Sequence, residues 1–252
     1  MILTRMKVIN VNDKSRIFIT GDTHGDIDRS KLNTRQFTEQ KNLTKNDYVI
    51  IAGDVGMLWF SFTKRHPDGL SAEDKNCIQW YESKNFTTLF VDGNHENHDA
   101  FERFPVEEWN GGKIHRISDS VFHLMRGQVF TIDGKTFFTM GGADSVDKYH
   151  RVQGLSWWPN EMPSKEEYEE AISNLDKHDM KVDYVVSHCC GTSLLPQLFT
   201  MHPDSDTLTS FFDHLEFDFG LEFKHWYFGH HHVDKVLDDK HTCLYNKIIE
   251  IT

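Results

Sequence analysis

The sequence is poor in cysteine and proline and contains no long hydrophobic run. Its 252 residues include four cysteines, none in a CxxC pair, and six prolines. Cys189 and Cys190 are adjacent and poorly placed to bridge each other, which excludes a disulfide framework and suits a reducing compartment. No window approaches the roughly 18 apolar residues of a membrane-spanning helix. The first stretch, MILTRMKVINVNDKSR, has neither the apolar core nor the cleavage site of a secretory signal. We therefore expect a cytoplasmic protein with no membrane partner.

Basic side chains are also scarce relative to acidic ones. The chain has 27 Lys and Arg against 39 Asp and Glu, a formal net charge of −12. An acidic surface repels phosphate backbones, which disfavours long nucleic acid as a partner but allows a small phosphorylated substrate in a locally positive pocket. There is no internal repeat or Pro/Gly/Ser-rich linker, so we expect a single domain over residues 1–252. Histidine, in contrast, is abundant, with 16 residues, and is the commonest side-chain metal ligand.

Short strand patterns alternate with helical ones, which predicts an α/β chain. Strands buried on both faces are indicated by runs of four or five apolar, β-branched or aromatic residues. These runs are Arg16–Thr20, Tyr48–Ala52, Thr88–Val91, Tyr184–Ser187 and Trp226–Phe228. Antiparallel strands are expected over Val121–Gly141, where Asp133-Gly134 predicts a hairpin turn.

Helices are predicted over Ala72–Lys84, Ser164–Asp179 and Thr207–Phe219. In the second, Ser164 is placed as an N-cap and Glu167 completes a capping box. The third carries an aromatic stripe that we interpret as core rather than as a cofactor site. Its members are Phe211, Phe212, Leu215 and Phe219.

Polar residues that can bind a metal or move a proton directly follow the five predicted strands. They are Asp22, His24, Asp54, Asn94, His95, His188 and the run His230, His231 and His232. Ligands of open α/β sheets bind at the carboxyl ends of the strands, so we expect these turns to converge on one crevice. The glycines that precede them would let the chain turn sharply and approach a ligand closely. Oxygen and nitrogen donors without thiolate suit Mn, Fe, Zn or Ni ions. The donors are too many for one ion, which predicts a pair of ions sharing a bridging carboxylate.

In family order, the motifs D-x-H, GD, GNH[ED], H and GHxH resemble the calcineurin-like metallophosphoesterase family. The resemblance extends from about Arg16 to His232 and implies a four-layer α/β/β/α sandwich of two mixed sheets flanked by helices. It implies that one ion is bound by Asp22, His24 and His232. It implies that the other is bound by Asn94, His188 and His230. Asp54 would bridge the two ions, and His95 would stay off them and face the leaving group.

Several residues near the candidate ligands are not expected to bind an ion. In an extended segment His230 and His232 point the same way and His231 points the other way, so we expect His231 to bind no ion. Asp26, Asp28 and Glu96 could each orient a ligand imidazole or simply lie in a solvated loop. Both interpretations stay open.

These residues predict a metal-dependent phosphoesterase in which a hydroxide bridging the ions attacks phosphorus. His95, as an imidazolium, would donate to the leaving oxygen. The arginines that protein phosphatases carry beside the second and third motifs are missing, so a small or nucleotide-like phosphomonoester or diester is favoured over a phosphoprotein. The alternatives are a nuclease and a catalytically silent metal-binding scaffold of the same fold.

Candidate substrate contacts lie outside the metal motifs. Arg29 follows the first motif, and His150 and Arg151 lie in the long irregular segment 141–163. We interpret that segment as a candidate active-site cap. Its Trp157 and Trp158 could form a wall of the substrate pocket or cover the core.

Overall fold

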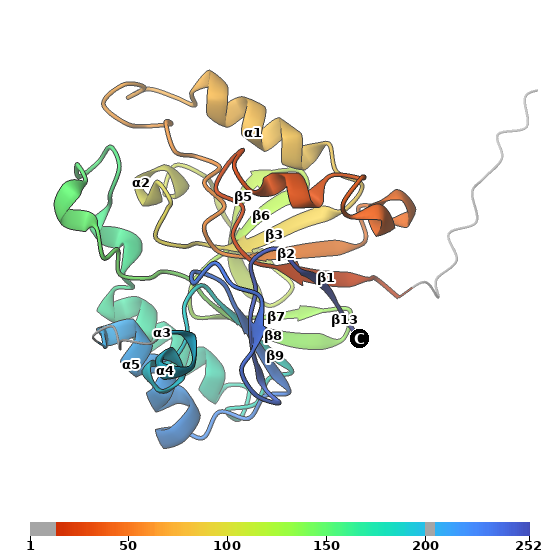
Figure 1. Cartoon of the computed structure of the whole chain (residues 1–252), viewed down its shortest axis with the longest axis vertical. Helices are drawn as coiled ribbons and strands as arrows, with labels where there is room; N and C mark the ends of the chain where they lie inside the picture. Colours follow the sequence, from red (N-terminus) through yellow and green to blue (C-terminus); the bar gives the residue numbers. More distant parts are fainter. Residues whose placement is uncertain (1–13, 200–204) are drawn as a thin grey trace, which may run out of the picture.

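Two mixed β-sheets pack face to face and carry helices on their outer faces (Figure 1). The computed structural model describes residues 14–199 and 205–252, so most of the stretch examined for a secretion signal lies outside it. The seven-stranded sheet has the order β13-β1-β2-β3-β6-β5-β4 and the six-stranded sheet the order β11-β12-β10-β9-β8-β7. The architecture confirms the expected four-layer α/β/β/α sandwich.

The first sheet consists of β1 (Ile17–Thr20), β2 (Tyr48–Ala52), β3 (Thr87–Val91), β4 (Val106–Trp109), β5 (Gly112–Ser118), β6 (Val121–Leu124) and β13 (Ile248–Ile251). The second consists of β7 (Gln128–Ile132), β8 (Lys135–Met140), β9 (Tyr184–Ser187), β10 (His225–Phe228), β11 (Lys235–Val236) and β12 (His241–Cys243). The helices are α1 (Ala72–Glu82), α2 (His98–Phe101), α3 (Lys165–Asp176), α4 (Leu195–Leu198) and α5 (Thr207–Asp213).

Side-chain alternation along the central strands explains why both of their faces are apolar. In β1, Ile17 and Ile19 contribute to the core between the two sheets, whereas Phe18 faces the helical layer over the first sheet. β2 alternates in the same way, with Ile50 between the sheets. The five strands predicted from short apolar runs are all present, because a strand buried on both faces needs a continuous apolar run.

The predicted hairpin is only part of the structure formed by residues 121–141. β7 and β8 pair antiparallel around Asp133 and Gly134, whose φ angles of 49° and 74° suit a tight hairpin turn. β6, however, belongs to the first sheet, where it runs parallel to β3 and antiparallel to β5. The expectation of antiparallel strands over Val121–Gly141 is therefore confirmed for β7 and β8, whereas β6 finds its antiparallel partner, β5, outside this region.

The three helix predictions are confirmed at their starts, but each predicted helix extends past the end of the observed α-helix, and the difference is largest for α5. Ser164 caps α3 and forms the predicted capping box with Glu167. α5 continues into one turn of π-helix at His214–Asp218. The wider turn takes Phe219 off the apolar stripe, and its side chain is 46% exposed while Phe212 is buried. Placing Phe219 in the core is thus a wrong prediction, because the 3.6-residue period does not extend through a π-helical turn.

The sheet register brings the carboxyl ends of the parallel strands together. β1, β2 and β3 pair in parallel, as do β8, β9 and β10. The turns after β1, β2, β3, β9 and β10 therefore leave the two sheets at one edge. Within residues 14–199 and 205–252, no helix combines the length and apolar character that crossing a bilayer requires.

Candidate metal centre

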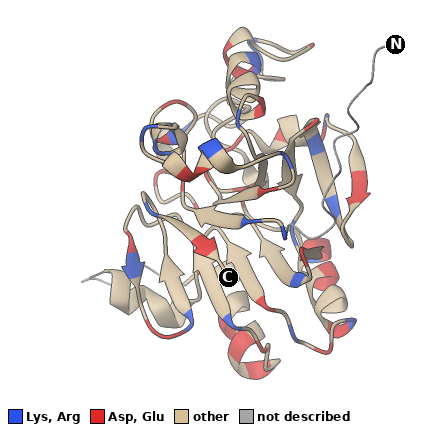
Figure 2. Ribbon diagram, turned by 90° about the vertical axis from the view of Figure 1, so that its right-hand side faces the viewer, with Lys and Arg blue, Asp and Glu red and all other residues tan. Residues whose placement is uncertain are grey.

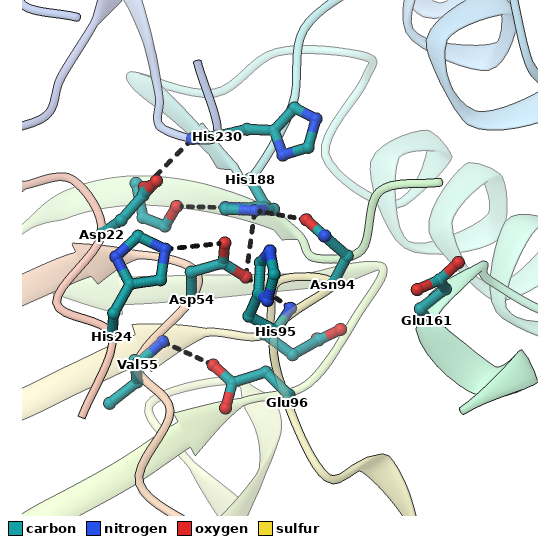
Figure 3. Close-up of polar contacts among 12 residues, drawn as sticks. Asp22, His24, Asp54, Val55, Asn94, His95, Glu96, Glu161, His188 and His230 are labelled. Atoms are coloured by element: carbon teal, nitrogen blue, oxygen red, sulfur yellow. Dashed lines mark hydrogen bonds and ion pairs between the residues drawn. The ribbon is translucent and has the colours of Figure 1, made fainter. Parts of the chain in front are cut away.

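Two groups of candidate metal ligands meet at this edge and share Asp54 (Figure 3). The first group is Asp22, His24, Asp54 and His232, and the second is Asp54, His188 and His230. Within each group, one ligand atom per residue lies within 4.8 Å of the others. Asn94 joins the second group, with its Oδ1 3.2 Å from His188 Nε2. The structure thus brings together all seven residues predicted as metal ligands.

Asp54 faces both groups. Its Oδ2 lies 3.3 Å from His24 Nε2, and its Oδ1 lies 3.3 Å from His188 Nε2. Among the described residues, Asp54 Oδ2 and Asp22 Oδ2 are buried and make no well-formed hydrogen bond, and each faces an imidazole nitrogen 3.3 Å away, His24 Nε2 and His232 Nε2 respectively. A buried carboxylate needs a compensating cation, which here is a protonated imidazole or a metal ion. The donor set and these two oxygens therefore fit bound metal ions.

Hydrogen bonds on the far side of three ligands aim their free donor atoms at the centre. His188 Nδ1 donates to the Ala52 carbonyl at 2.8 Å, which leaves Nε2 as the ligand atom. His24 Nδ1 pairs with Asp28 Oδ2 at 2.7 Å, so Asp28 contacts a candidate ligand directly. Asn94 Nδ2 donates to Ser145 Oγ at 3.0 Å and directs Oδ1 inward. Such outer contacts fix the tautomer and orientation of metal ligands.

The two other acidic residues left open by the sequence differ from each other. The Glu96 carboxylate accepts from the backbone N–H groups of Val55 and Gly56, at 2.5 and 3.1 Å, and so fixes the turn that follows Asp54. Asp26 is exposed. Glu161, which the sequence did not single out, accepts a 2.6 Å hydrogen bond from Ser145 Oγ and supports the contact to Asn94.

Left-handed backbone positions the ligands. Four of them have positive φ, namely His24 (41°), Asp54 (48°), His230 (68°) and His232 (51°). Non-glycine residues rarely adopt this region, and such strain concentrates at functional sites. Because His230 and His232 have this conformation, the predicted extended geometry of the histidine run is wrong. The chain still places His232 in the first ligand group and His230 in the second. His231 points towards Cys190, with 3.6 Å between His231 Nε2 and Cys190 Sγ.

Glycines make room for the ligands at their closest approach. A Cβ on Gly53, whose φ is 91°, would lie 2.1 Å from His188 Nδ1. A Cβ on Gly93 would lie 2.1 Å from Asp54 Oδ1. Neither contact is tolerable, so these two glycines are required by the packing of the candidate ligands.

The charges of the centre shift the pKa values of its buried groups. Burial opposes ionisation of both Asp54 and His188, but their mutual attraction outweighs it. The pKa of Asp54 is held well below its ordinary value, and that of His188 is raised to about 10. Without a cation, the centre therefore holds protons on histidine, and binding of a metal ion would displace them.

His95 lies beside the centre rather than among the ligand groups. Its backbone N–H donates to Asp54 Oδ1 at 2.7 Å. The Arg151 guanidinium faces both ring nitrogens of His95, with Nη1 3.2 Å from Nδ1 and Nη2 3.5 Å from Nε2, and the shorter contact favours Nδ1 as the acceptor. Burial lowers the pKa of His95, and the Arg151 charge lowers it further, against the opposing effect of Asp54. This geometry favours a neutral imidazole over the imidazolium expected from the sequence.

The three candidate substrate contacts lie in different places. Arg151 reaches His95, as described. The Arg29 guanidinium lies 3.1 Å from Cys77 Sγ and over the Trp80 ring, so it packs against α1 and does not join the cluster. His150 is exposed. Trp59, which the sequence did not single out, lies with its ring centroid 6.4 Å from that of His95. Nothing in the local periodicity marks it as a site residue.

Comparison with known proteins identifies the family. The calcineurin-like phosphoesterase family matches residues 15–234, and the chain belongs to this family. The family is one of phosphoesterases, and this chain carries two groups of residues suited to metal binding. A comparison with curated proteins gave no significant match.

Two solved structures are similar to this chain. One is a protein provisionally named 5′-nucleotidase from Staphylococcus aureus in complex with α-ketoglutarate, with 14% identity, TM-score 0.47, and coverage of 91% of this chain and 48% of that one. The other is phosphopantetheinyl hydrolase from Mycobacterium tuberculosis, with 14% identity and a TM-score of 0.42. The match covers 92% of this chain and 88% of that one. This chain therefore spans about half the length of the first structure.

Proposed function

We propose that this protein hydrolyses a small phosphate ester using two divalent metal ions that share Asp54. The observation that carries the proposal is the position of the Asp54 carboxylate, which lies 3.3 Å from a histidine of each ligand group. A carboxylate between two donor sets is the arrangement that a dinuclear hydrolytic centre needs. Mn, Fe, Zn and Ni all suit these oxygen and nitrogen donors.

In this proposal each donor set holds one ion. Asp22, His24 and His232 would hold the first, and Asn94, His188 and His230 the second, with Asp54 common to both. Bound ions would activate water as the nucleophile and offset the charge that develops on the phosphoryl group. His188 and Asn94 are held for this role by their hydrogen bonds to Ala52 and Ser145.

His95 is proposed to act on the leaving group. The shorter of the two Arg151 contacts is to Nδ1, which supports a proton on His95 Nε2, and Nε2 would then donate a hydrogen bond to the leaving oxygen as the ester bond to phosphorus breaks. Arg151 holds the ring in place and brings a positive charge from segment 141–163 to the site. We therefore propose that this segment acts as a partial cap, with Ser145 and Arg151 as its contributions.

The charge of the molecule supports a small substrate. On the face shown in Figure 2, the basic segments are short and separated by acidic and uncharged ones. With a net charge of −12, such a surface disfavours long nucleic acid. A phosphomonoester or a nucleotide-like diester fits the site better than a polynucleotide or a phosphoprotein.

Turnover after metal exchange tests the proposal. Metal-stripped protein is refilled with Mn²⁺, Fe²⁺, Ni²⁺ or Zn²⁺ and assayed with 4-nitrophenyl phosphate and bis(4-nitrophenyl) phosphate. We expect turnover of at least one ester that is abolished in Asp54→Ala. His95→Ala should lower kcat by about 10²- to 10⁴-fold. Absence of turnover of either ester with every ion would instead identify a catalytically silent metal-binding scaffold.

A further inference from the structure

An apolar slot opens next to the candidate metal centre. The cavity has a volume of about 270 Å³ and is lined by His24 and His95 on the side of the centre and by Ile27, Trp59 and Phe60 away from it. Gly25 and Gly56 supply bare backbone between these side chains, where a Cβ on Gly56 would lie 2.7 Å from Gly25 N. The slot therefore begins at the residue proposed to face the leaving group and continues into an aromatic wall.

Trp59 is held in a fixed orientation in this wall. Its ring is inclined by 28° to that of His95, at a centroid separation of 6.4 Å. On another side it makes an edge contact with Trp158, 5.6 Å between centroids, and Trp158 is only 2% exposed. A half-buried indole supported by a buried one presents a stable flat surface rather than a mobile side chain.

The rim of the slot exposes apolar surface to solvent. Ile27 is 75% exposed and Phe60 is 37% exposed. Single exposed apolar residues are common, but these two line the same cavity as Trp59. An apolar occupant would cover them and gain the free energy of removing their surface from water.

The charges around the slot disfavour an anionic occupant. Among the described residues that line it, none is lysine or arginine, and the exposed Asp26 adds a negative charge. Arg151 contacts His95 at the end of the slot beside the metal centre, so a second phosphate or a carboxylate along the Ile27, Trp59 and Phe60 wall would meet no lysine or arginine of the lining. The volume lies near the lower limit of small-molecule pockets, about 300 Å³, which suits one ring system and excludes a peptide chain.

We propose that this slot binds the leaving group of the substrate and that this group is an uncharged aromatic or heteroaromatic ring stacked on Trp59. The inference depends on the proposed function, because it takes the His95 side of the slot as the place where the leaving oxygen departs. Hydrolysis adds water to phosphorus, breaks the bond to the ring-bearing oxygen and returns a proton to that oxygen. The ring-bearing alcohol then leaves through the open end of the slot.

Paired esters and paired variants test this inference on the metal-loaded protein. Trp59→Ala should lower kcat/KM for 1-naphthyl phosphate by about fivefold or more, mainly through KM, since base–aromatic stacking contributes on this order or more. For the compact ester 2,2,2-trifluoroethyl phosphate the change should stay below about threefold. Trp59→Phe should retain most of the wild-type kcat/KM for 1-naphthyl phosphate. Trp80→Ala, which removes a half-buried tryptophan of α1, is the matched control and should change neither ester.

Binding without turnover provides a second measurement. By calorimetry on the metal-loaded protein, Trp59→Ala should weaken phenylphosphonate about tenfold and leave methylphosphonate unchanged. Ile27→Ser changes an exposed side chain and should leave the protein folded. It should also weaken phenylphosphonate binding. Equal effects on ring and compact ligands, or no effect on ring ligands, would overturn the inference. Ring-selective binding that depends on Trp59 in a protein without turnover would retain the slot and refute the proposed function.

Discussion

At the scale of single residues, the candidate ligands depend on partners that touch no metal themselves. His188 is oriented by the Ala52 carbonyl, His24 by Asp28 and Asn94 by Ser145. Each contact satisfies one polar atom of the ligand and leaves the other aimed at the centre. The arrangement predicts that metal affinity responds to substitutions outside the ligand set.

The Asp28 carboxylate provides the most accessible test of this point. Asp28→Asn removes the charge that lies 2.7 Å from His24 Nδ1, so His24 becomes a weaker and less well-oriented donor. We expect metal affinity at the first site to fall by about 10- to 100-fold, measured by competition with a chelator. Asp238→Asn, which breaks a similar contact to His241 outside the centre, is the matched control. Equal affinities in wild type and Asp28→Asn would refute the role of Asp28.

At the scale of elements, the site is made by the turns that follow five parallel strands. Each strand ends at one edge of its sheet, and the turns after β1, β2, β3 and β10 carry a glycine as their first or second residue, whereas the turn after β9 begins with His188 itself. The strands supply rigidity, and the turns supply the ligands. A substitution that fills a turn should therefore damage the site more than the fold.

Gly93 tests the role of the turns. Gly93→Ala places a Cβ within 2.1 Å of Asp54 Oδ1 and within 2.4 Å of Asp54 N, so the bridging carboxylate must move. We expect a folded protein by circular dichroism that has lost at least one equivalent of bound metal by elemental analysis. Gly69→Ala is the control, since a Cβ there meets nothing within 4 Å. Full metal occupancy in Gly93→Ala would contradict the proposed geometry.

Segment 141–163 contacts Asn94 through Ser145 and His95 through the long side chain of Arg151, and the second contact can be tested by substitution. Arg151→Met removes the guanidinium 3.2 Å from His95 Nδ1 and keeps most of the apolar stem. We expect kcat to fall on the order of tenfold or more, with metal occupancy unchanged, because His95 loses its orientation. Lys148→Met in the same segment, which breaks only the pair with Asp144, should leave kcat near wild type. If the two variants behave alike, Arg151 has no specific role.

At the scale of the whole molecule, buried neutral histidines couple stability to pH. His98 and His115 are buried, and burial lowers the pKa of each to about 3. The unfolded chain takes up these protons near pH 6.5, whereas the folded protein does so only near pH 3. Their contribution to stability is therefore complete above about pH 6.5 and is lost as the pH falls towards 3.

Urea denaturation of metal-free protein between pH 6.5 and 4.5 measures this coupling. The free energy of unfolding should fall with decreasing pH, with a slope of up to about 1.4 kcal/mol per pH unit for each such histidine. His115→Gln removes one of these groups, so its curve should be shallower than wild type by up to that amount. Parallel curves for the two proteins would show that His115 is not held neutral by the fold.

How far the sequence predicts this molecule depends on the kind of signal. The buried strands and the convergence of Asp22, Asp54 and His188 were predictable, because a continuous apolar run followed by a polar turn is visible locally. Trp59 and Ser145 were not, since their contacts join segments far apart in the chain and leave no period or motif.

Irregular backbone conformations could not be predicted from the sequence either. The π-helical turn that exposes Phe219 and the left-handed residues at His230 and His232 break the periods on which the predictions rested. The short strands β11 and β12 lack apolar runs of strand length and were also missed.

The central claim is that Asp54 is shared by two metal ions, and anomalous diffraction tests it most directly. Crystals of the protein loaded with Mn²⁺, measured near the manganese absorption edge, should show two anomalous peaks about 3.5–4 Å apart, one on each side of the Asp54 carboxylate. A single peak, or two peaks of which neither lies in contact with Asp54, would contradict the account.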